Sequence, residues 1–130
     1  MWGFLIVVLG LSLGSASWSI LASATQYSYR EPAFQDNFYG IKIHGNRCWI
    51  VGYYGTVLYS RDRGSTWEIQ QSATKEALFQ ATFISDQKGW ISGSYGTILH
   101  TQNGGRNWSV QGSSTQEHLF GIDFISEREG

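Results

Sequence analysis

Apolar and polar residues alternate along most of the chain beyond residue 38. The segment 79–85 (FQATFIS) has apolar side chains at alternate positions and is followed by the polar turn DQKG. Three further short segments of this kind come next, each separated from its neighbour by glycine- or asparagine-containing turns: WISGS (90–94), TILHT (97–101) and WSVQG (108–112). Period-two alternation interrupted by turn residues at short intervals predicts four β-strands joined by tight turns.

The same pattern occurs twice, at an offset of 41 residues, so that WIVGYYGTVLYSRDRGSTW from Trp49 matches WISGSYGTILHTQNGGRNW from Trp90. An earlier copy of the first strand is present at 39–43. Four strands in about 41 residues is the size of one β-propeller blade. We therefore expect an all-β fold, a β-propeller of four-stranded antiparallel blades, with a solenoid of stacked hairpins as the structural alternative.

The N-terminus is different in kind. Residues 2–13 read WGFLIVVLGLSL, which is apolar except for Ser12, and 22–24 (ASA) has the small-x-small form of a signal peptidase site. The apolar run is shorter than the roughly 20 residues of a membrane span. This predicts a cleaved export signal at 1–24, with an uncleaved anchor as the alternative. The domains expected after it are an extended segment at 25–38, blades at 39–72 and 79–112, and a partial blade at 119–130.

Composition and charge exclude several functions. The chain has nine Lys plus Arg and ten Asp plus Glu, so bulk charge does not attract it to nucleic acid. Cys48 is the only cysteine, which excludes an internal disulfide, and its place in a strand pattern predicts a small buried side chain. The three histidines lack metal-ligand spacing and no phosphate-binding loop is present. We expect no metal, no cofactor and no catalytic residue.

The turn before the fourth strand has the same form in both repeats, SRDRGSTW at 60–67 and TQNGGRNW at 101–108. In this turn a hydroxyl ends the third strand, a carboxylate or amide accepts backbone N–H groups, a glycine supplies an unusual backbone angle, and a tryptophan opens the fourth strand. These turn residues are Ser60, Asp62, Gly64 and Trp67, then Thr101, Asn103, Gly105 and Trp108. Because Asn103 replaces a carboxylate, the motif is interpreted as a fold element, and both tryptophans are expected to be buried against the next blade.

The pattern S-x-D-x-G-x-x-W resembles the Asp-box of BNR-type repeats, which occurs in proteins of different function. The longer pattern G-W-I-x-G-x-x-G-T-I-L-x-T-x-x-G-G-x-x-W, from Gly89 to Trp108, resembles the blade repeat of the photosystem II stability and assembly factor family. The resemblance implies a seven-bladed propeller, of which this chain holds two blades and the first strand of a third, so an N-terminal fragment is expected.

The resemblance also implies a function. It implies a non-enzymatic, exported scaffold of the thylakoid lumen or periplasm, close to the membrane but not spanning it after signal cleavage. Its expected partner is a protein such as an immature photosystem II reaction-centre subunit. The family's partner-binding surface is known for arginines, and the candidates here, which all fall in predicted turns and are otherwise solvated surface charges, are Arg47, Arg61, Arg63 and Arg106.

One alternative function remains open from the sequence. An exported Asp-box glycoside hydrolase of the sialidase kind, here lacking its catalytic residues, has the same turn motif. Such an enzyme works with paired carboxylates. The acidic residues that the repeat places in turns or strands are Asp62, Asp86 and Asp123.

Overall fold

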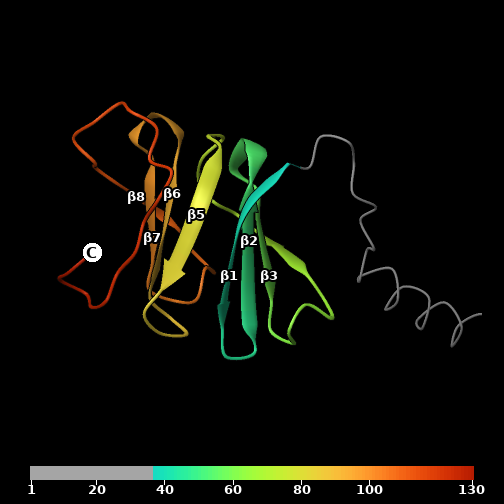
Figure 1. The fold of residues 1–130 in the computed structure, drawn as a ribbon. Helices are drawn as coiled ribbons and strands as arrows, with labels where there is room; N and C mark the ends of the chain where they lie inside the picture. Colours follow the sequence, from blue (N-terminus) through green and yellow to red (C-terminus); the bar gives the residue numbers. More distant parts are fainter. Residues whose placement is uncertain (1–36) are drawn as a thin grey trace, which may run out of the picture. The chain divides into compact units, whose positions relative to one another are not determined.

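The computed structural model describes residues 37–130, so the predicted export signal at 1–24 and nearly all of the segment 25–38 lie outside the described residues. The first sheet contains β1 (Phe38–His44), β2 (Arg47–Gly52), β3 (Val57–Ser60) and β4 (Glu68–Gln70). The second contains β5 (Leu78–Phe83), β6 (Gly89–Gly93), β7 (Ile98–Thr101) and β8 (Ser109–Gln111). Both sheets are antiparallel with their strands in chain order (Figure 1), which confirms the prediction of four-stranded antiparallel units.

A short 3₁₀ turn joins the second and third strands of each sheet, η1 (Tyr53–Gly55) and η2 (Ser94–Gly96). Gly55 and Gly96 have φ angles of 70° and 69°. A β-carbon at Gly55 would overlap the carbonyl oxygen of Thr74, and one at Gly96 would overlap that of Thr115. Both the backbone angle and the close approach of a carbonyl therefore require glycine.

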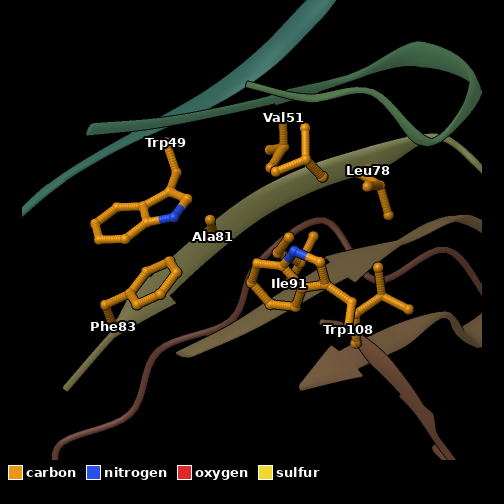
Figure 2. Close-up of a cluster of buried hydrophobic side chains, with 9 residues drawn as sticks. Trp49, Val51, Leu78, Ala81, Phe83, Ile91 and Trp108 are labelled. Carbon is orange, nitrogen blue, oxygen red and sulfur yellow. The ribbon is translucent and has the colours of Figure 1, made fainter. Parts of the chain in front are cut away.

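The two sheets pack face to face, and β1 lies next to β5. A β-carbon at Gly40 of β1 would overlap the carbonyl oxygen of Phe79 in β5, so the two backbones touch. The core between the sheets (Figure 2) contains Trp49, Val51 and Val57 of the first sheet with Leu78, Ala81, Phe83, Ile91, Leu99 and Trp108 of the second. Burial of this apolar surface holds the two sheets together.

Aromatic rings cross the interface between the sheets. Phe83 stacks on Trp49 with ring centroids 3.7 Å apart and an interplanar angle of 18°. Trp108 meets the Phe83 ring edge-on, with centroids 6.0 Å apart. Offset-stacked and edge-to-face rings are favourable geometries beyond the area they bury. The rings fix how one sheet sits on the next.

Residues 119–124 lie against the outer face of the second sheet in a similar way. Phe124 stacks on Trp90 with centroids 4.0 Å apart, as Phe83 does on Trp49. The Thr82 hydroxyl donates to Oδ1 of Asp123 at 3.0 Å. The segment is not a strand, because no other segment of residues 37–130 forms a ladder with it. Its side chains repeat the contacts that β5 makes with the first sheet, but its backbone is not paired in a β-ladder.

The prediction that Trp67 is buried is wrong. Its ring is 40% exposed, whereas that of Trp108 is 6% exposed. Trp108 belongs to the core shared with the preceding sheet, not with the following segment. The expected direction of contact was therefore also wrong. Within residues 37–130 no sheet lies against the corresponding face of the first sheet, so no neighbouring sheet covers Trp67.

No helix within residues 37–130 has both the length and the apolar character that crossing a bilayer requires.

Candidate functional site

The turn of the first sheet is a closed set of hydrogen bonds around Asp62. The Ser60 hydroxyl donates to Asp62 Oδ1 at 2.8 Å and accepts from the Gly64 N–H at 2.7 Å. Asp62 also accepts from the Thr66 N–H at 2.8 Å and from the Thr66 hydroxyl at 2.6 Å. These bonds, the Thr66 hydroxyl first among them, lower the pKa of Asp62 to about 2. The carboxylate is engaged by its own turn.

The turn of the second sheet keeps the same scheme with an amide. The Thr101 hydroxyl donates to Asn103 Oδ1 at 3.1 Å and accepts from the Gly105 N–H at 2.9 Å. Asn103 Oδ1 also accepts from the Asn107 N–H at 2.9 Å. An uncharged oxygen thus closes the turn as a carboxylate does, which is the geometry of a fold element.

The four candidate arginines all lie at one end of the blades. Arg47 begins β2, Arg61 and Arg63 lie between β3 and β4, and Arg106 lies between β7 and β8. In an antiparallel meander the first and third turns lie at the same end of the sheet. Here the Arg63 N–H in the third turn donates to the Asn46 carbonyl in the first turn at 2.9 Å. We call this the arginine end. The structure brings the predicted residues to the same end of the two sheets.

Two of these arginines are already used to hold the fold. Arg47 contacts Asp86 of the second sheet, with Nη1 donating to its carbonyl at 3.1 Å and Nη2 lying 3.4 Å from Oδ2. Arg63 Nε donates to Asn46 Oδ1 at 2.8 Å. Arg61 and Arg106 are exposed in their turns. Arg63 is exposed as well but is bonded to Asn46, and Arg47 is half-buried against Asp86, so Arg61 and Arg106 are the two exposed arginines that these bonds do not engage.

The acidic residues considered for hydrolysis each have a structural contact. Asp62 closes its turn, Asp86 contacts Arg47, and Asp123 accepts from the Thr82 hydroxyl. Within residues 37–130 no group of three or more His, Cys, Asp or Glu side chains is placed to hold a metal ion. These contacts give the carboxylates roles in packing and turn closure.

Cys48 and His100 lie in the packed parts of the strands. Cys48 is 4% exposed, as the sequence predicted. The His100 ring stacks on Trp90 with centroids 4.8 Å apart, in the place that Tyr59 occupies beside Trp49. Burial lowers the pKa of His100 below 6.5, and the nearby Lys88 charge lowers it further.

Sequence reasoning missed an aromatic surface at the opposite end of the blades. Tyr39 of β1, Phe79 of β5 and Phe120 of the third segment form a row, with centroid distances of 5.6 Å and 4.7 Å between neighbours. These three residues are 40 and 41 residues apart, which is close to the repeat length, so they occupy equivalent positions in successive repeats. That spacing was the sequence signal that could have revealed the row. We call the following residues the aromatic end: Tyr39, Tyr53, Tyr54, Phe79, Tyr95, His118 and Phe120.

Comparison with known proteins agrees with this architecture. The family model described as photosynthesis system II assembly factor YCF48 matches residues 13–121. A solved structure of YCF48 bound to D1 peptide is 29% identical with a TM-score of 0.52, and the match covers 58% of this chain and 26% of that one. YCF48 from Cyanidioschyzon merolae is 28% identical with a TM-score of 0.52, over 61% of this chain and 28% of that one.

The curated proteins include no match to this chain. The chain spans about a quarter of the length of the two solved relatives. Those relatives are β-propellers, and the paired four-stranded sheets described above are consistent with part of such a propeller, which confirms the predicted fold class. The family match covers most of the 130 residues. The chain therefore belongs to the photosystem II assembly factor YCF48 family.

Proposed function

We propose that this chain is a non-enzymatic scaffold that binds a segment of a photosystem II reaction-centre subunit during assembly or repair of the complex. One observation carries the proposal: the family match extends over residues 13–121, and a solved member of that family is bound to D1 peptide. A D1 segment is accordingly the partner to test first.

The arginine end supplies suitable chemistry for such a segment. Guanidinium groups bind carboxylates through paired, charge-assisted hydrogen bonds. Arg61, Arg63 and Arg106 are exposed at the arginine end. Arg63 also donates to Asn46, and the half-buried Arg47 is bonded to Asp86. The turns that carry Arg61 and Arg106 are closed by their own hydrogen bonds, so the backbone at these two arginines is fixed before the partner arrives, which lowers the cost of binding. We assign the peptide's acidic groups to this end.

We further propose that the protein works outside the compartment of its synthesis, in the thylakoid lumen or periplasm. The apolar run at 2–13 and the small-x-small site at 22–24 support export. N-terminal sequencing of the mature protein tests this directly, with a start near Thr25 expected. A mature protein that retains Met1 contradicts cleavage.

Binding is tested with fluorescently labelled peptides that tile D1, each titrated with the full chain and followed by anisotropy. We expect saturable binding by at least one peptide with acidic groups. Replacing Arg61 and Arg106 together by alanine should weaken it by roughly tenfold or more, because each charge-assisted hydrogen bond contributes about 1.5–3 kcal/mol. Lys75→Ala removes an exposed positive charge at the opposite end of the blades, where Lys75 lies over the Tyr54 ring; it is the matched control and should leave the affinity unchanged.

Two results contradict this proposal. If no D1 peptide binds saturably, the partner is wrong. If a peptide binds but the double variant and Lys75→Ala have equal affinities, D1 is the partner and the arginine end is not its site.

A further inference from the structure

The aromatic end exposes an unusual amount of ring surface for one end of two small sheets. Tyr39, Tyr54 and Phe120 are 48%, 59% and 68% exposed, and Tyr95 is 61% exposed. Five of the rings form a continuous series, because Tyr39, Phe79 and Phe120 are neighbours in the row and His118 lies between Phe120 and Tyr95, with centroid distances of 6.0 Å and 4.9 Å. A continuous exposed aromatic surface, unlike scattered single residues, marks a site of interaction.

Backbone strain holds two of these rings outward. Tyr54 and Tyr95 have φ angles of 54° and 51°, a left-handed conformation that bulky side chains rarely adopt. The adjacent glycines, Gly55 and Gly96, are required by the close approach of a carbonyl oxygen, but nothing in the turn requires a tyrosine before them. Strain of this kind persists where the surrounding structure imposes it and often accompanies function. Both sheets carry the same strained, exposed tyrosine.

The polypeptide enters the first sheet at this same end. The Asn37 carbonyl accepts a hydrogen bond from the Tyr53 N–H at 2.8 Å, so the described chain starts beside the exposed tyrosines. Residues 14–36 connect this point to the apolar run at 2–13. While that run lies in a bilayer, before cleavage or as a retained anchor, the blades are attached to the membrane through the chain that enters them at the aromatic end.

We propose that the aromatic end is a membrane-contacting surface whose rings lie at the headgroup level of a lipid bilayer. Tyrosine is enriched at membrane–water interfaces, because its ring is apolar and its hydroxyl reaches water or headgroups. Phe79 and Phe120 supply purely apolar rings in the middle of the row. The blades then stand on the membrane with the arginine end directed away from it.

Charged groups at this end are few and compatible with a bilayer. The exposed Lys75 lies over the Tyr54 ring, with Nζ 5.7 Å from its centroid, and reaches the level of lipid phosphates. The Glu76 carboxylate accepts from the Ser94 hydroxyl at 2.8 Å, so it is turned into the sheet. Glu117 is exposed and remains at the water-facing margin. The proposal does not depend on D1 binding at the arginine end.

The test measures the depth of two labels in the full chain bound to vesicles of phosphatidylcholine with a minority of phosphatidylglycerol. An environment-sensitive NBD group is attached at Tyr95→Cys or at Arg106→Cys, which are exposed positions on opposite ends of the second sheet. The native Cys48 is buried and is replaced by alanine in both. The apolar run tethers both proteins equally, so a difference between labels reports the orientation of the blades.

We expect the label at position 95 to shift to shorter wavelength and to be quenched by brominated lipid several-fold more than the label at 106. Replacing Tyr39 and Phe120 by serine should abolish this difference. The matched control replaces Ile69 and Val110, which are 58% and 63% exposed on the fourth strands, by serine and should preserve it.

Equal quenching at the two positions overturns the proposal, because the blades are then tethered without a preferred orientation. A response of the label at 95 to D1 peptide but not to vesicles also overturns it, and assigns the aromatic end to peptide binding.

Discussion

The two sheets present the same face of the same repeat, but the face is buried in one and exposed in the other. In the second sheet it lies against the first sheet and its apolar residues are at most 6% exposed: Ala81, Phe83, Ile91, Leu99 and Trp108. In the first sheet the equivalent residues are exposed or half-buried: Ile41, Ile43, Ile50, Leu58 and Trp67. Ile41 and Ile43 are 60% and 61% exposed, against 3% and 5% for Ala81 and Phe83.

This difference separates what a repeat encodes from what its neighbour supplies. The repeat decides which side chains share a face, because alternate residues of a strand point to the same side. The preceding blade decides whether that face is removed from water. In repeat architectures the stability therefore resides largely in the interfaces between units. Equivalent substitutions in the two sheets should have unequal effects.

The largest difference should come from the two turn tryptophans. Trp108→Ala removes a ring from the shared core and should lower the free energy of unfolding by about 3–5 kcal/mol. Trp67→Ala removes a ring that is already 40% exposed and should cost far less. Urea denaturation of both variants measures the comparison. Equal losses would mean that the two faces are equally covered.

The second-largest difference should come from substitutions of the glycines in the two turns. Gly64 and Gly105 both have φ near 90°, so alanine at either should cost roughly 1–2 kcal/mol for the left-handed conformation. A β-carbon at Gly105 would also overlap the buried Gln70 side chain of the first sheet, adding about 1–3 kcal/mol. At Gly64 it would lie 3.2 Å from the ring of Trp67, a residue that is 40% exposed and has room to shift.

Thermal and urea unfolding of Gly64→Ala and Gly105→Ala should rank the second as clearly less stable. Valine in place of alanine should be severe at both positions, because a β-branched residue resists this backbone angle more strongly. A larger loss at Gly64 than at Gly105 would contradict the packing of the second turn on the first sheet.

His100 and Tyr59 give a smaller, pH-dependent contrast. Because the pKa of His100 is lowered in the folded protein, the unfolded chain binds the proton first as pH falls below about 6.5. The free energy of unfolding should therefore be highest above pH 6.5 and should decrease as the pH falls through and below that value. His100→Tyr, which copies the first sheet, should remove this component. An unchanged pH profile of urea midpoints in the variant would exclude His100 as its source.

The smallest effect should come from Asp62 and Asn103. The pKa of Asp62 is about 2 against an ordinary 3.8, so its stabilising contribution is complete above pH 3.8 and is lost as pH falls toward 2. Asp62→Asn should be mild at neutral pH, since Asn103 closes the same turn, and should flatten the acid limb of the stability curve. A loss at neutral pH as large as that of Gly64→Val would contradict the turn assignment.

The strands and turns of the fold were predictable from sequence because they depend on local patterns. The segment expected at 90–94 is β6, Gly89–Gly93, and that expected at 97–101 is β7, Ile98–Thr101. The hydrogen bonds of Asp62 and Asn103 were also predictable, because they join residues within one turn. Period-two alternation and turn chemistry carry this information in a few consecutive residues.

Contacts between blades were not predictable in the same way. Arg47 contacts Asp86, and Phe79 contacts Phe120, across about 40 residues of sequence. The alignment of repeats shows which residues are equivalent but not which face is covered, so Trp67 was wrongly expected to be buried. The aromatic end was missed because each of its rings looked like an ordinary strand or turn residue in its own blade.

Hydroxyl-radical footprinting of the intact chain tests most directly the claim that a blade's turn tryptophan is covered by the preceding blade. Peptide-level mass spectrometry after brief exposure reports the oxidation rates of Trp67 and Trp108 in one sample, with the unfolded chain in urea as the reference for intrinsic reactivity. We predict that Trp67 is oxidised faster, in rough proportion to exposed fractions of 40% and 6%. Equal protection of the two rings would contradict the account, because both faces would then be buried.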